Sequence, residues 1–234
     1  MVLLIGTANA NRNDECLDTK EISKEINLDG ILGIAVDAGA GSLTVIGRPG
    51  LATAQIRGVA CSRRAGDLDR ISLESRNDGP TLTLQTVLPP PVASSIGNLN
   101  ARLDLKVEVP SAFALSVVDT TGSMKIDGVA SVEIDDGTGS IQVKDVPGLV
   151  HVVKDTSGSI KILRVGSVRI DEDGSGSISA SVVVGDVHVG RDESGSIAAN
   201  DVGGSFTVLS NASGGVRYQN VAGDVRVART PGSN

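Results

Sequence analysis

The sequence predicts an all-β protein, built as a parallel β-solenoid with about 18–19 residues per coil. Three observations lead to this fold class. Apolar residues recur at a nearly fixed interval through the second half of the chain, each repeat contains two stretches of alternating apolar and polar residues, and a small Gly-containing corner returns once per repeat. Alternation with a period of two is typical of strands with one buried face. Strands this short bury that face only by stacking on the next repeat.

The composition agrees with a β-rich chain and excludes one class of partner. Of the 234 residues, 29 are Gly and only 1% are aromatic. Such a core must be built from Val, Ile and Leu, which favour strands. The formal net charge is −7, and because phosphates select basic surfaces, we expect no nucleic-acid partner. No apolar run reaches the roughly 18 residues of a membrane-spanning helix, so no transmembrane segment is expected.

The N-terminus favours export. Residues 1–10, "MVLLIGTANA", are apolar and end in an Ala-x-Ala-like triplet, so they are interpreted as the remnant of a secretory signal, although the usual basic start is missing. The two cysteines, Cys16 and Cys61, are predicted to form a disulfide if the chain is exported. In a reducing compartment they would stay unpaired. The expected location is periplasmic or secreted, in a bacterium.

The following residues, 24–100, are expected to form irregular N-terminal coils of one solenoid domain that spans 24–227. Strands are predicted around Ile34 and Leu43, and again around Ile71 and Leu82. The least repetitive stretch, residues 89–100 ("PPPVASSIGNLN"), is predicted to be a protruding loop. No linker separates domains, and residues 228–234 are expected to be a disordered tail.

Regular repeats occupy residues 101–227. Aligned on the apolar residue two after the repeated Gly, the units start at Met124, Ile141, Ile160, Ile178, Ile197 and Val216. Four further apolar columns then fall into register, among them Val129, Val146, Val165, Val183, Val202 and Val221. A helical repeat would need a spacing near 3.6 and would not tolerate a Gly in every unit.

Each coil must turn a corner, and the residues for it recur. The Asx row consists of Asp119, Asp136, Asp155, Asp173, Asp192 and Asn211, each three residues before a Gly. The Gly row consists of Gly122, Gly139, Gly158, Gly176, Gly195 and Gly214. An Asx side chain can accept a bond from the backbone two residues on, and Gly adopts positive φ. We interpret both rows as turn chemistry at one corner.

The Asx row also raises the question of a metal. Stacked carboxylates repel one another unless a cation or hydrogen bonds offset the charge. Asp136, Asp155, Asp173 and Asp192 are therefore weak calcium candidates, and "DEDGSGSI" resembles the start of a calcium loop. The twelfth position of that loop is Val182 where Glu is needed. Because turn capping explains the row without an ion, no metal or cofactor site is predicted.

No catalytic residues are predicted. The two histidines, His151 and His188, occupy equivalent outward positions with Arg169 between them, which opposes a shared metal. Sugar-cleaving solenoids usually need paired carboxylates in a groove and aromatic rings for stacking, and this chain has regularly spaced Asp and few rings. We therefore expect a protein without enzymatic activity.

The stretch "ARLDLKVEVPSAFALSVVDTTGSMKIDGV" followed by recurring Gly-Ser-Ile units resembles the bacterial putative-adhesin β-solenoid family, which includes domains of cell-envelope proteins of the Lia stress-response group. The resemblance covers roughly residues 24–227. It implies a right-handed, single-stranded β-solenoid in an exported or envelope-associated protein. It carries over no catalytic residues, because the activity of the family is largely undefined.

The leading hypothesis is a non-enzymatic, exported binding or scaffold module of the bacterial cell envelope, adhesin-like, whose partner is a protein or an envelope glycan. The alternatives are a carbohydrate-active β-helix enzyme and a calcium-stabilised structural rod. Uncapped solenoid ends also make a homo-oligomer through those ends possible.

Overall fold

A computed structural model describes Cys16 and residues 18–90 and 101–228. The proposed signal remnant at residues 1–10, most of the expected loop at 89–100 and residues 229–234 of the expected tail lie outside the described residues. The elements, in chain order, are β1 (Asp18–Asn27), β2 (Gly33–Ala40), β3 (Leu43–Arg48), β4 (Thr53–Ser62), the 3₁₀ turn η1 (Ala65–Arg70), β5 (Ser72–Asp78), β6 (Thr81–Val87), β7 (Ala101–Pro110), β8 (Ala114–Thr121), β9 (Met124–Asp127), β10 (Ser131–Thr138), β11 (Ile141–Ser157), β12 (Ile160–Ser175), β13 (Ile178–Val183), β14 (Val187–Ser194), β15 (Ile197–Val202), β16 (Phe206–Asn211), β17 (Val216–Val221) and β18 (Val225–Val227).

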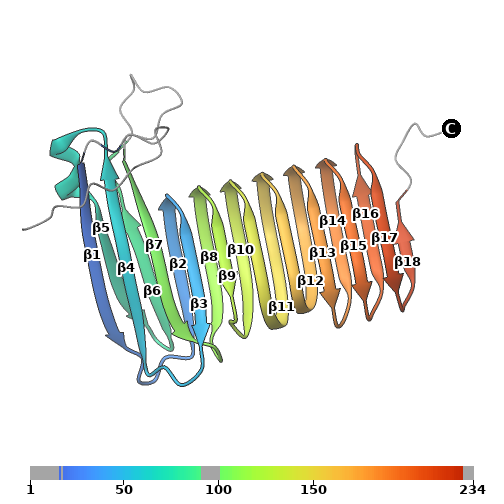
Figure 1. Ribbon diagram of the computed structural model, residues 1–234, viewed down its shortest axis with the longest axis horizontal. Coiled ribbons are helices and arrows are strands. Elements are labelled where there is room, and N and C mark those ends of the chain that lie inside the picture. The colour runs from blue at the N-terminus through green and yellow to red at the C-terminus, as the bar shows by residue number, and fades with distance from the viewer. Residues whose placement is uncertain (1–15, 17, 91–100, 229–234) are drawn as a thin grey trace, which may run out of the picture.

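The described chain is a stack of flattened coils, which confirms the predicted β-solenoid (Figure 1). From β8 to β16 every strand pairs in parallel with strands of the coils before and after it. The predicted apolar columns are in register: Ile141 pairs with Ile160, Ile160 with Ile178, and Ile178 with Ile197. Coil stacking therefore satisfies the backbone and joins the apolar faces into one interior.

The interior is narrow and aliphatic. Each regular coil contributes a few Val, Ile or Ala side chains that are almost completely buried, such as Val143, Val152 and Ile162. Phe206 is the one aromatic side chain among the largest fully buried side chains of the described residues. A core this thin is filled by β-branched residues because their compact side chains suit a pleated surface.

The N-terminal portion departs from the predicted irregular coils. β2 and β3 join the parallel stack through β8 and β9. In contrast, β1 pairs antiparallel with β4, β4 pairs antiparallel with β7, and β5 and β6 form a hairpin closed by Gly79 and Pro80. The first strand also begins at Asp18, upstream of the boundary expected at Lys24. Local turns make the strands antiparallel neighbours here, so this part of the chain does not follow the pattern of the regular repeats.

The N-terminal end is closed by charged side chains that point inward from β1. Ile22 and Ile26 pack against the core, and between them Lys24 donates from Nζ to Ser75 Oγ at 3.5 Å. Lys20 Nζ donates to the carbonyl oxygen of Ile71 at 3.2 Å. Inward-pointing charges on an edge strand disfavour pairing with another chain.

The C-terminal end has a different character. Within the described residues, β17 pairs only with β15 and β18 pairs only with β16, so each has one unpaired backbone edge. Tyr218, which contacts Phe206 with ring centroids 6.0 Å apart, is 53% exposed, and Val225 and Val227 are partly exposed. The last coil therefore leaves in solvent side chains at positions that earlier coils bury.

The corner of each coil requires glycine. From Gly122 to Gly214, all six members of the predicted Gly row have φ between +114° and +151°. A Cβ at Gly139 or at Gly158 would overlap the carbonyl oxygen of the row member in the preceding coil. Both the backbone conformation and the close approach of successive coils thus exclude a side chain.

From β11 onward the second corner uses residues other than glycine. Asp145, Arg164, Val182, Asp201 and Asn220 stand in one row, each with φ between +53° and +57°. Asn and Asp tolerate this left-handed conformation, whereas it is strained for a β-branched residue such as Val182. Arg164 bonds Asp145 through two nitrogens, and Asn220 Nδ2 donates to Asp201 Oδ1 at 2.8 Å, so side chains in this row also link neighbouring coils.

Candidate functional site

The Asx row, interpreted from the sequence as turn chemistry at a corner, lies inside the solenoid. Successive members are in register across β8, β10, β11, β12, β14 and β16. All six are buried, with 1–4% of each residue exposed. We call these residues, Asp119, Asp136, Asp155, Asp173, Asp192 and Asn211, the acid column.

Turn capping accounts for only part of the acid column. Asp155 Oδ1 accepts a hydrogen bond from the backbone N–H of Ser157 at 3.1 Å, which is the predicted Asx turn. Asn211 instead donates from Nδ2 to the carbonyl oxygen of Gly214 at 3.4 Å. Both carboxyl oxygens of Asp119, Asp173 and Asp192 lack a hydrogen bond of good geometry. The backbone N–H groups of Thr121 and Ser194 still lie close enough to Asp119 and Asp192 to lower their pKa values. The column therefore holds polar capacity that the turns do not use.

Burial makes the column hard to ionise. It raises the pKa of Asp119 to about 7, that of Asp136 to about 6 and that of Asp155 to about 7. The pKa values of Asp173 and Asp192 are raised as well, chiefly by burial. Neighbouring carboxyl groups add to the effect, since the charge on Asp136 acts on both Asp119 and Asp155. At neutral pH part of the column is thus protonated.

The column does not assemble the ligand set of a metal. In the described part of the chain, no group of three or more His, Cys, Asp or Glu side chains converges as metal ligands would. The calcium candidates Asp136, Asp155, Asp173 and Asp192 stand in single file, one per coil. Calcium needs six to eight oxygens at about 2.3–2.6 Å. The geometry suits bonds between neighbouring carboxyl groups better than a cation cage.

A second candidate site is the outer wall over β11, β12 and β14. A groove of about 600 Å³ runs there, and its charged rim is formed by Lys154, Glu172 and Arg191, which stand in register on successive coils. The remaining lining residues are Asp155, Thr156, Asp173, Gly174, Ser175, Glu193 and Ser194. We call this surface the outer groove. Alternating charges and hydroxyl groups make it a polar, hydrogen-bonding surface.

His151 belongs to a cluster of polar side chains on β10, β11 and β12. Its Nε2 lies 2.7 Å from Asp171 Oδ2 and its Nδ1 lies 3.3 Å from Glu133 Oε2. Arg169 Nε also donates to Asp171, at 2.7 Å. Burial works against ionisation of Asp171, but the hydrogen bonds from His151 and Arg169 hold its pKa below the usual value. The alternating strand pattern placed His151 outward, but could not show these partners.

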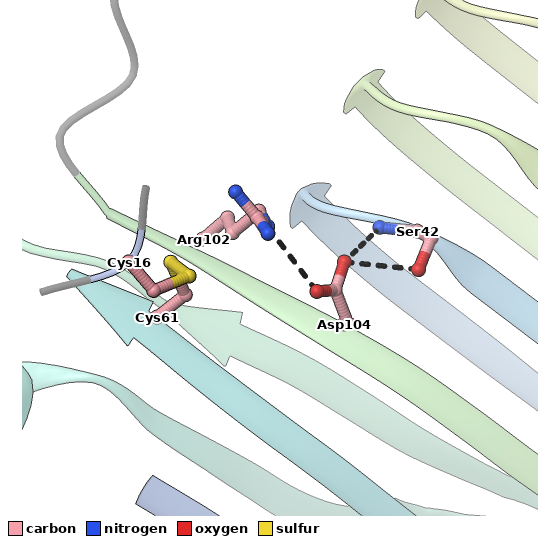
Figure 2. A network of polar contacts seen from close by, with 5 residues as sticks. All are labelled: Cys16, Ser42, Cys61, Arg102 and Asp104. Carbon is pink, nitrogen blue, oxygen red and sulfur yellow. Dashed lines mark hydrogen bonds and ion pairs between the residues drawn. A yellow bond between two sulfur atoms is a disulfide. The ribbon is translucent and has the colours of Figure 1, made fainter. Parts of the chain in front are cut away.

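The first Gly-Ser corner is closed by a carboxylate at the N-terminal end (Figure 2). Asp104 Oδ1 accepts from the backbone N–H of Ser42 at 2.7 Å and from Ser42 Oγ at 2.9 Å, while Arg102 Nε donates to Asp104 Oδ2 at 3.2 Å. Close by, a disulfide joins Cys16 to Cys61, with the Cα atoms 5.4 Å apart. These contacts secure the end of the stack.

Comparisons with known proteins give structural likeness at low identity. No protein-family model matches the sequence, and no curated protein resembles it detectably. Similar solved structures include a putative cell adhesion protein from Clostridium sporogenes, with 10% identity over 90% of this chain and 99% of that one and a TM-score of 0.37. A putative adhesin from Bacteroides fragilis shows 16% identity over 89% and 97%, with a TM-score of 0.32. One from Parabacteroides distasonis shows 10% identity over the same shares, with a TM-score of 0.33.

The signal for the buried column is present in the sequence but interrupted. In β8 and β10, strict alternation from Val117 to Asp119 and from Ile134 to Asp136 places the Asp on the inner face. In the later coils a register shift, seen where Asp135 pairs with Lys154, leaves two consecutive outward residues before the Asp. This bulge breaks the period of two. The Asp-x-Ser-Gly motif alone therefore predicts the turn but not the burial of the Asp side chain.

Proposed function

We propose that the protein is an exported, non-enzymatic, adhesin-like β-solenoid that binds a polar partner of the bacterial envelope through the outer groove. The observation that carries this proposal is the outer groove itself, where Lys154, Glu172 and Arg191 are held in register by the parallel strands beneath them. A rigid scaffold that presents regularly spaced charges and hydroxyl groups suits an extended ligand with repeated hydrogen-bonding groups. An envelope glycan has that chemistry.

The disulfide supports the export part of the proposal. Cys16 and Cys61 are paired, and disulfides persist mainly in oxidising compartments such as the periplasm or the cell exterior. The only helical element in the described residues is the six-residue η1, and no helix there is long and apolar enough to cross a membrane.

The test is sedimentation of the purified protein with peptidoglycan sacculi. We expect the wild type to sediment with the sacculi, and a variant carrying Lys154→Ala, Glu172→Ala and Arg191→Ala to bind about tenfold more weakly, which corresponds to about 1.4 kcal/mol. Lys161→Ala is the matched control, because Lys161 is an exposed lysine that precedes the second corner, away from the outer groove. Equal sedimentation of all three proteins, or none by the wild type, would contradict the proposal.

The same samples separate binding from catalysis. A carbohydrate-active enzyme would release soluble sugar fragments with new reducing ends from the sacculi, in proportion to time and protein concentration. We expect no such release. Fragments that appear with the wild type and disappear with the triple variant would favour the enzyme alternative and place its site in the outer groove.

A further inference from the structure

All buried side-chain oxygens that lack a hydrogen-bond partner in the described part of the chain gather in one place. Nine are oxygens of the acid column, from Asp119 to Asn211, and the tenth is Thr86 Oγ1. Thr86 continues the acid column by one position. Its Cβ lies 3.7 Å from the position that a Cβ on Gly39 would occupy, and Gly39 pairs with Asp119. Unsatisfied buried polar groups are costly and rare in native proteins. Because these oxygens are aligned along the solenoid, one explanation should account for all of them.

Asn211, the last residue of the acid column, indicates that a hydrogen-bond donor is missing. Asn211 Oδ1 is a buried acceptor without a donor, and the side chain in register with it on the preceding coil is Asp192. An ionised carboxylate offers no donor, whereas a protonated one donates a single O–H. Asp192 can therefore satisfy Asn211 only if it carries a proton. The same reasoning applies between neighbouring carboxyl groups, where one must donate for the other to accept.

The charged side chains around the acid column do not neutralise its carboxylates. The ionised groups that act on it are acidic: Asp37 of β2 on Asp119, Asp135 of β10 on Asp136, and Glu193 of β14 on Asp192. Among the described residues no Lys, Arg or His forms an ion pair with a member of the acid column. Five unpaired negative charges in a buried file would cost far more than the fold can offset. Protons are the counter-ions that need no extra space.

We propose that the acid column is a chain of hydrogen-bonded carboxyl groups that retains protons in the folded protein at neutral pH, and that its deprotonation loosens the solenoid as the solution becomes alkaline. Each proton serves as a bridge between neighbouring coils. Removing one leaves a buried negative charge and one bridge fewer, and further losses place like charges on neighbouring coils, which push the coils apart. The device makes the rod most stable under mildly acidic conditions.

The direction of the pH dependence follows from proton binding. The column binds protons more tightly in the folded state than in the unfolded chain, where Asp titrates near pH 4. Stability from this source is complete below that pH and is lost as the pH rises through the folded pKa values of about 6 to 7. Carboxylates paired with cations would give the opposite slope.

The first experiment is thermal unfolding of the full chain from pH 4 to pH 9 with EDTA present. We expect Tm of the wild type to fall by about 5–10 °C between pH 5 and pH 8.5. Asp155→Asn and Asp173→Asn should flatten this dependence, because the amide keeps the shape and hydrogen-bonding capacity but has no proton to lose. Asp145→Asn is the matched control, since Asp145 is exposed at the second corner and paired with Arg164, and it should retain the wild-type slope.

Two measurements on the wild type keep the proposal open to refutation if the column variants do not fold. Infrared spectra at pH 7 should show the carbonyl stretch of protonated carboxylic acid, and unfolding in weakly buffered solution at pH 7 should release protons. A Tm independent of pH together with fully ionised carboxylates would overturn the proposal. So would a rise of Tm with millimolar Ca²⁺ that Asp155→Asn abolishes, because the column would then bind a metal.

Discussion

At the scale of single residues, the fold depends on positions that have no side chain or that adopt an unusual backbone conformation. The Gly row allows successive corners to approach until the backbone of one coil touches the next. The sequence showed that these glycines recur and that a turn needs them. It did not show that neighbouring coils come so close that even a methyl group is excluded. That requirement depends on stacking, which a single coil does not reveal.

Gly158→Ala should therefore destabilise the protein strongly. A Cβ at this position would overlap the carbonyl oxygen of Gly139, and φ is +148°. We expect a loss of about 3 kcal/mol or more in the free energy of unfolding, measured by urea titration. The control is Gly50→Ala, since Gly50 has φ of +74° but no atom within 4 Å of the added carbon. It should lose only about 1–2 kcal/mol. Similar losses would show that close stacking is not the cause.

At the scale of elements, the N-terminal strands act as a closing unit for the stack. β1 is held by β4 along its length and, at its start, by the disulfide between Cys16 and Cys61. Its inward face combines Ile22 and Ile26 with two lysines that bond to η1, to Ile71 and to β5. This arrangement seals the apolar interior and leaves an edge that is unfavourable for further pairing.

The disulfide should contribute measurably to this closing unit. Replacing both cysteines with Ala opens a link between residues 45 apart in sequence, and we expect the free energy of unfolding to fall by about 2–4 kcal/mol. Hydrogen exchange should accelerate mainly in β1, because β1 is an edge strand that pairs only with β4 among the described strands. Wild type treated with a reductant is the matched comparison. Unchanged stability in both would mean that β1 is held by packing alone.

The sequence predicts the structure of the C-terminal half of the molecule better than that of the N-terminal half. Columns such as Ile141, Ile160 and Ile178 predict the coil register, because each position repeats the same environment. A strand near β5 was predicted, around Ile71, but the antiparallel pairing of β1, β4 and β5 was not, since each pairing occurs once and hairpins depend on local turns. The outer groove was also out of reach. Its rim residues come from three coils, and nothing in the spacing of Lys154, Glu172 and Arg191 shows that the surface between them is hollow.

At the scale of the whole molecule, the solenoid has two unlike ends. The N-terminal end is closed, whereas β17 and β18 each have an unpaired backbone edge within the described residues. In repeat proteins, stability comes from contacts between neighbouring units, so a coil with one neighbour opens more easily than a coil with two. Association of two copies through such ends, which the sequence suggested, stays a proposal.

Hydrogen exchange resolved by peptide should show this difference. We expect amides of β17 and β18 to exchange at least tenfold faster than those of β11 and β12, which have neighbours on both sides. If copies associate through the C-terminal end, exchange in β17 and β18 should slow as the protein concentration rises, while exchange in β1 stays constant. Uniform exchange along the chain would mean that the solenoid opens only as a whole.

The number of coils sets both the length of the rod and the number of buried acidic residues in the acid column. The coils from β8 to β16 each add one buried Asx residue, one corner Gly and a few aliphatic side chains, in the same register as the coil before. Duplication of one coil in the gene would thus lengthen the rod by one strand spacing, about 4.8 Å, without disturbing its neighbours. It would also add one more proton-holding site. A lineage that gained or lost coils would change the reach of the molecule and its tolerance of alkaline conditions in the same step.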